Sequence, residues 1–293
     1  MWFPSTEAAV LAIAIGSVGA VLTAVGRRAP PPTALRVLLG PNIGYVFTSP
    51  RAWVRISRAV GAAFIALAAS IPLQSILLSD ACLATATSLE LAALTAALTL
   101  YARFVGERAS VEDPAPDCLT ARPIVTPITP FKVWWVTYAG LGLGTAFLIY
   151  AVSLARLVRG VFVTHINVWG VPDGFSSSPS MLYSMLVMPV ALAVSSVTTI
   201  AFSRRMPEVF YRPWLRPETL ETIVKCAQAS TALAYAYSSG IIAYALSLSA
   251  FGASPLPLPA LLPLLAAYVA FSAYGVALGL RDYVRFRRKY LRT

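Results

Sequence analysis

Seven long apolar stretches constrain this chain more than any other feature of its sequence. Each is long enough to cross the hydrocarbon core of a bilayer as a helix, which takes about 20 residues. Backbone amides in lipid must be hydrogen-bonded internally, so runs of this length form helices. The predicted fold class is therefore all-α, a polytopic transmembrane helical bundle. We place the seven spans at residues 8–26, 59–79, 82–102, 133–155, 181–202, 222–250 and 256–280.

The composition agrees with a membrane protein. Only 12% of the residues are charged and 58% are hydrophobic, whereas about 25% charged residues is usual in soluble domains. The net charge of +11 would suit nucleic acid, but basic residues in a membrane protein mark its cytoplasmic loops. We expect the lipid bilayer as a partner and no nucleic acid. Cys82, Cys118 and Cys226 are too scattered for a zinc site or a disulfide framework, and we expect neither a metal nor a cofactor.

The distribution of basic residues predicts the orientation. Of the 23 Lys and Arg residues, 21 fall in alternate loops on one side, within residues 27–58, 103–132, 203–225 and 281–293. Only Arg156 and Arg159 fall on the other side. Cytoplasmic loops carry the excess of basic residues. The sequence therefore predicts a multi-pass protein of the cell membrane with its N-terminus outside and its C-terminus inside.

We expect residues 1–293 to form a single integral membrane domain. Within it, residues 1–104 would hold the first three spans and residues 105–131 a cytoplasmic linker. Four spans would follow in residues 132–280. Residues 281–293 would form a basic cytoplasmic tail.

The segment 163–178, between the fourth and fifth spans, would lie outside and holds the only histidine, His165. Metal binding or catalysis by His165 would need partner ligands, and Asp173 is the only acid nearby in sequence. We interpret the segment as an ordered loop in which His165 and Asn167 bond to loop backbone. A tight turn would be built from Gly170, Pro172, Asp173 and Gly174. Such a loop can also be a recognition surface.

Glu90 is the acid that lies well inside a predicted span. An intramembrane carboxylate is costly and is a functional hypothesis by default. Its predicted neighbour is Gln74, because spans two and three would form a hairpin around residues 79–81. The structural interpretation is a protonated Glu90 hydrogen-bonded to Gln74 or Thr87. The functional alternative is a secondary transporter that uses Glu90.

Small residues predict where helices pack closely. The fourth span holds Gly140, Gly142 and Gly144, and the seventh holds the Gly-x-x-x-Gly step of Gly275 and Gly279. Such faces let two helix backbones approach within one chain or between chains. They would suit a homo- or hetero-oligomer, and hence an accessory subunit of a larger membrane complex.

The segment 39–53 precedes the second span on the predicted inner side. We interpret it as a turn followed by a basic interfacial helix, in which Trp53, Arg55 and Arg58 anchor to headgroups. The alternative is a cytoplasmic docking surface. Sequence motifs of hydrolases and of phosphate-binding loops are absent, and we expect no enzyme.

Two motifs together resemble a known family. The outer motif runs His165-x-Asn167-x-x-Gly170-x-Pro172-Asp173-Gly174. It resembles the signature of a small membrane domain of unknown function that accompanies the SdpI family of toxin-immunity membrane proteins. The inner motif runs from Pro41-Asn42 through Gly44 and Thr48 to Trp53 and resembles the SdpI cytoplasmic loop. Val46 stands where the family has arginine, and the two motifs follow each other in the reverse order.

The resemblance implies a non-enzymatic immunity or sensor protein. It would recognise a peptide toxin outside and signal to a regulator protein inside. The outer binding residues it implies are His165, Asn167, Gly170 and Asp173. The inner ones it implies are Asn42, Gly44, Thr48 and Trp53. No catalytic role comes with them.

Overall fold

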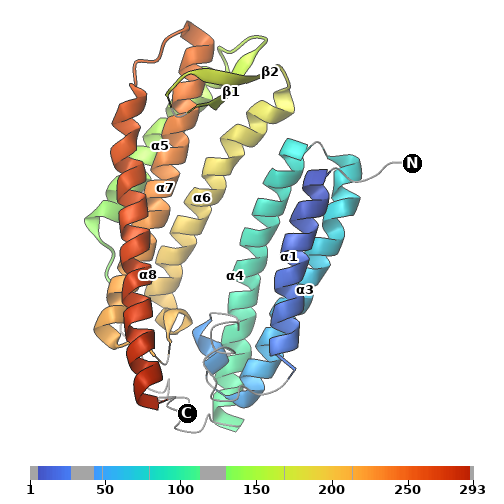
Figure 1. The fold of residues 1–293 in the computed structure, drawn as a ribbon, viewed down its shortest axis with the longest axis vertical. Helices are drawn as coiled ribbons and strands as arrows, with labels where there is room; N and C mark the ends of the chain where they lie inside the picture. The colour runs from blue at the N-terminus through green and yellow to red at the C-terminus, as the bar shows by residue number, and fades with distance from the viewer. Residues whose placement is uncertain are drawn as a thin grey trace. The chain divides into compact units, whose positions relative to one another are not determined.

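The computed structural model describes residues 6–27, 43–47, 49–78, 80–112, 130–167, 169–212 and 214–290. Seven helices within these ranges are long and apolar enough to cross a membrane, which confirms the all-α prediction for a multi-pass membrane protein. They are α1 (Thr6–Val25), α3 (Pro50–Leu77), α4 (Asp80–Glu112), α5 (Trp135–Ala155), α6 (Pro179–Arg205), α7 (Pro217–Phe251) and α8 (Leu262–Tyr290) (Figure 1).

Shorter elements connect the long helices. Three are 3₁₀ helices, η1 (Gly44–Phe47), η2 (Pro207–Phe210) and η3 (Leu258–Leu261). Between α5 and α6 lies an antiparallel hairpin of two strands, β1 (Phe162–Ile166) and β2 (Pro172–Ser176). The sequence predicted a loop there, so the strands are a correction.

Several helices are longer than the predicted spans. The predicted spans stopped at charged residues, whereas the helices continue past them. The second span was placed from residue 59, but α3 begins at Pro50. Ser49 caps α3, since its Oγ accepts from the Ala52 amide at 2.9 Å, and a proline suits the first helical turn. The helix α4 continues past the end of the predicted third span to Glu112, so the start of the predicted linker 105–131 is helical. The C-terminal helix α8 reaches Tyr290, which places most of the predicted tail in a helix.

The described residues form two compact units. Unit 1 draws on Met1–Phe131, Ala201–Val224 and Val276–Thr293, and unit 2 on Lys132–Ile200 and Lys225–Gly275. Unit 1 is thus assembled from three separate parts of the chain. Contacts between parts so far apart in the sequence leave no local sequence pattern.

In unit 1, small residues bring α1 and α3 together. A Cβ at Gly19 would lie 2.9 Å from the Gly61 carbonyl oxygen, and one at Gly61 would overlap the Thr23 side chain. The carboxyl end of α1 is closed by Arg58, whose Nε donates to the Gly26 carbonyl at 3.2 Å. A cation at this position also opposes the helix dipole. This contact was not predicted from the sequence.

In unit 2, α5 packs on α7 through two glycines one turn apart. A Cβ at Gly140 would lie 3.1 Å from the Ala232 Cβ, and one at Gly144 would lie 2.5 Å from the Tyr235 ring. Gly142 has no heavy atom from another part of the chain within 4 Å of its Cβ position. Two of the three predicted glycines therefore serve packing within the chain.

The glycine step of α8 also faces α7. In unit 2 a Cβ at Gly275 would lie 3.5 Å from the Cys226 Cβ, and in unit 1 one at Gly279 would lie 3.7 Å from the Ile223 Cδ1. Both distances are ordinary van der Waals contacts. The step therefore contacts a helix of the same chain.

Candidate functional site

The outer motif forms the β1–β2 hairpin. Phe162 pairs with Ser176 and Val163 with Phe175. Pro172, Asp173 and Gly174 lie in β2, and the prediction that these three belong to a tight turn is wrong. The strands were missed because each is only five residues long and Gly174 is untypical of a strand.

Asn167 and Gly170 shape the turn of the hairpin. The Asn167 Oδ1 accepts from the amides of Trp169 at 2.9 Å and Val171 at 3.0 Å, an Asx-type arrangement. Gly170 has a φ of +81°, a conformation that glycine adopts without steric cost. The prediction that Asn167 bonds to loop backbone is confirmed.

The prediction that His165 bonds to loop backbone is wrong, because His165 is paired with a side chain. Its Nδ1 lies 2.5 Å from the Asp173 Oδ1. The two side chains are 70% and 45% exposed, so the pair faces outward. Opposite His165 in the register stands Gly174. No group of three or more His, Cys, Asp or Glu side chains gathers within the described ranges.

The hairpin is attached to α7. The Val163 amide donates to the Ser249 Oγ at 2.9 Å, and the Tyr244 hydroxyl donates to the Gly170 carbonyl at 3.3 Å. Phe162 and Val163, the first two residues of β1, are buried. The contacts of Ser249 and Tyr244 were not predicted from the sequence. Tyr244 lies 74 positions from Gly170, and Ser249 lies 86 positions from Val163. Contacts over such separations leave no local sequence pattern.

The hairpin segment also carries exposed apolar side chains. Trp169 is 84% exposed, and Val171 and Phe175 are each more than half exposed. Large aromatic side chains in such a setting supply contact area for a ligand or for the headgroup region. The hairpin thus presents a polar pair and an apolar surface together.

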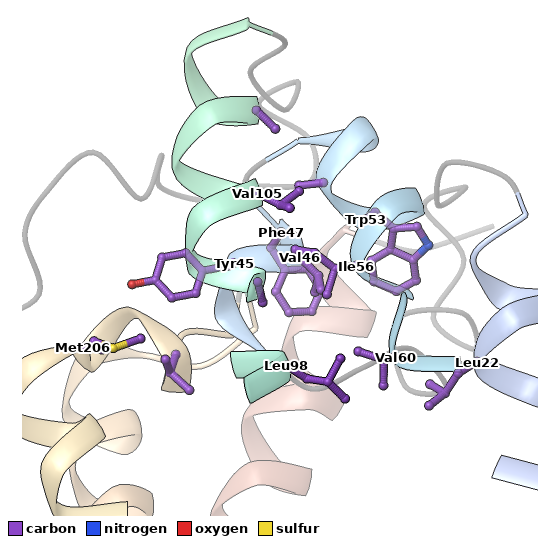
Figure 2. Close-up of a cluster of buried hydrophobic side chains, with 14 residues drawn as sticks. Leu22, Tyr45, Val46, Phe47, Trp53, Ile56, Val60, Leu98, Val105 and Met206 are labelled. Atoms are coloured by element: carbon purple, nitrogen blue, oxygen red, sulfur yellow. The ribbon is translucent and has the colours of Figure 1, made fainter. Parts of the chain in front are cut away.

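Four residues of the inner motif are buried in unit 1, in the cluster that Figure 2 shows: Tyr45, Val46, Phe47 and Trp53. All four residues of η1 are buried. The Phe47 ring lies 5.9 Å from the Trp53 ring and 5.8 Å from the Trp214 ring. Val46, at the position of the family arginine, is 1% exposed. We call this group the η1 cluster; its buried members are Leu22, Tyr45, Val46, Phe47, Ala52, Trp53, Ile56, Val60, Leu98, Ala102, Val105, Ala109, Met206 and Val209.

Trp53 does not anchor to headgroups, and that prediction is wrong. Its side chain is 0% exposed, and its Nε1 donates to the Val25 carbonyl at 3.5 Å. The early start of α3 turns Trp53 toward α1. Gly44 is also buried, and Asn42 and Thr48 lie outside the described residues. Gly44 and Trp53 therefore support the interior and present no docking surface.

The η2 segment closes the same cluster. A Cβ at Gly44 would overlap the Glu208 carbonyl oxygen, so only glycine fits there. The Tyr45 hydroxyl donates to the Glu208 Oε2 at 3.4 Å. Burial, followed by the charge of Glu208, raises the pKa of Tyr45 well above its ordinary value. Burial also lowers the pKa of Arg212, which follows η2, to about 10.

Glu90 and Gln74 are neighbours, as predicted. The Gln74 Nε2 donates to both carboxylate oxygens of Glu90, at 2.8 and 2.9 Å. It also donates to the Ser70 Oγ at 3.2 Å. The pair joins α3 to α4, and Glu90 lies on the exposed side of α4.

Comparison of the chain with protein-family models, with curated proteins and with solved structures finds no match. The family resemblance therefore rests on the two motifs alone. The outer motif forms a partly exposed hairpin, and residues 44–47 and Trp53 of the inner motif are buried.

Proposed function

We propose that this membrane protein is a non-enzymatic immunity or sensor protein of the cell membrane, which recognises a peptide at its outer hairpin. One observation carries the proposal. The hairpin is held against α7 by Ser249 and Tyr244 while its polar pair and aromatic side chains remain exposed. A surface that is already ordered loses little entropy when it binds.

The exposed groups suit an amphipathic peptide. Trp169 and Phe175 would cover its apolar side chains. The Asp173 carboxylate would accept from a lysine, an arginine or the amino terminus of the peptide. No third strand pairs with the hairpin within the described chain, and an extended peptide would add beside β2 through backbone hydrogen bonds.

Signalling would pass through α7. Its Tyr235 bonds to Thr145 of α5 at 3.3 Å, and its Thr231 bonds to Ser196 of α6 at 3.2 Å. A peptide that shifts the hairpin would thus change how α7 packs against α5 and α6. Since Gly44 and Trp53 are buried, a regulator protein would meet the basic loops instead.

The test is protection of a sensitive host against membrane-active peptides encoded by neighbouring genes. We expect the double variant His165→Ala, Asp173→Ala to abolish protection while its level in the membrane is retained. Arg159→Ala, at an exposed position outside the hairpin, is the matched control and should protect fully. Unchanged protection by the double variant would end the proposal. Stoichiometric co-purification with other membrane proteins would favour the accessory subunit instead.

A further inference from the structure

Three arginines surround one buried carboxylate in unit 1. Asp282 of α8 has a side chain that is 2% exposed. Its oxygens accept from the Arg216 backbone amide at 3.3 Å, from the Arg216 Nε at 3.3 Å and from the Arg216 Nη2 at 3.4 Å. The Arg281 Nε and the Arg285 Nη1 lie 3.5 and 4.0 Å from Oδ1.

The charges in this group do not balance. One carboxylate faces three guanidinium groups, each with several N–H donors. The arginine side chains are 55%, 46% and 61% exposed, so each also reaches the surface. Asp282 is hydrogen-bonded to Arg216 and forms ion pairs with Arg281 and Arg285. The excess positive charge favours an anion on the exposed side of the three groups.

The position of the group indicates which anion. Arg216 directly precedes α7, and Arg281 and Arg285 lie in the last turns of α8, both candidate membrane spans. The ends of spanning helices lie at the level of lipid phosphates. Trp214 and Tyr283, whose rings are 6.1 Å apart, flank the group with the aromatic residues typical of that level.

We propose that Arg216, Arg281 and Arg285 bind the phosphate of an anionic phospholipid headgroup. Asp282 is a positioning residue that holds the guanidinium groups in a shared orientation. Arginine suits this role because its planar fork pairs with two phosphate oxygens at once.

The experiment uses the full chain in a non-ionic detergent and counts bound short-chain phosphatidylglycerol by native mass spectrometry. We expect Arg281→Gln and Arg285→Gln each to weaken binding about tenfold, the loss of one charge-assisted contact. Arg288→Gln, one turn further along α8, is the matched control and should change binding about twofold or less, as for a diffuse charge. Equal effects of Arg285→Gln and Arg288→Gln, or unchanged binding in both cluster variants, would overturn the site.

Two further arms identify the source of the phosphate and guard against misfolding. Short-chain phosphatidylcholine and inorganic phosphate should bind far more weakly than phosphatidylglycerol; equal binding of inorganic phosphate would overturn a lipid site. If a glutamine variant does not fold, the double variant Arg281→Lys, Arg285→Lys keeps the charge but loses the planar fork. It should still bind measurably more weakly than the unchanged chain, and full affinity would refute the arrangement.

Discussion

Gly174 stands across the hairpin from His165 with no room for a side chain between the two strands. A Cβ at position 174 would lie 2.7 Å from the His165 Cβ, closer than real Cβ contacts allow. The glycine therefore sets the approach of β2 to β1. That approach in turn brings Asp173 to the His165 ring.

Gly174→Ala should loosen the hairpin. The added methyl group has to push β2 away from β1 and separate the His165–Asp173 pair, at a cost of about 1–3 kcal/mol. Hydrogen exchange of residues 162–176 should become faster in the variant. Val171→Ala, at an exposed position of the same hairpin, should leave exchange unchanged. Slow exchange in Gly174→Ala would contradict the register.

Trp53→Ala should destabilise the protein strongly. Removing a fully buried indole leaves a cavity in the η1 cluster, and such changes cost about 3–5 kcal/mol. Thermal unfolding in mild detergent measures the loss. Trp135→Ala is the control, because that indole is 77% exposed. Similar losses for both variants would show that Trp53 is not part of the interior.

Two glycines of α5 allow a direct comparison of helix faces. Gly144→Ala should destabilise unit 2 by about 1–3 kcal/mol, because its Cβ would meet the Tyr235 ring. Gly142→Ala should be neutral or slightly stabilising, since alanine has the higher helix propensity. The unfolding midpoints of the two variants measure their difference in stability. If Gly142→Ala is the more damaging change, that face carries a contact with another chain.

Glu90→Gln tests the transporter alternative. A glutamine at position 90 still accepts from the Gln74 Nε2 through its amide oxygen, so we expect the fold to persist. Under the sensor proposal, proton flux into reconstituted vesicles and protection against peptides should both match those of the unchanged chain. A flux present in the original protein and lost in this variant would instead assign Glu90 to transport.

The sequence predicted what depends on local pattern. Apolar length located the seven helices, the hairpin between spans two and three brought Glu90 to Gln74, and turn chemistry explained Asn167. Contacts between segments that are far apart in the sequence were not predicted. The burial of Trp53 depends on α1 and on Trp214, which reaches the same cluster through Phe47.

The contacts of Asp282 could not be predicted from the local sequence either. In sequence it is one acid within a basic tail, and its role emerges only when α8 meets Arg216, 66 residues earlier. The β1–β2 pairing was hidden for another reason. Its strands are short, and the register between Val163 and Ile166 is irregular, so no clean alternation of polar and apolar residues marks them.

The η1 cluster has a consequence for the order in which the protein is made. Tyr45 leaves the ribosome long before Glu208, its hydrogen-bond partner 163 residues later. Met206 and Val209, which complete the cluster, also come late. Until they are synthesised, the apolar side chains of η1 have no cover from η2 and are open to chaperones or proteases. Chains that are truncated before residue 206 and released from the ribosome should therefore be degraded faster than released chains truncated after residue 210.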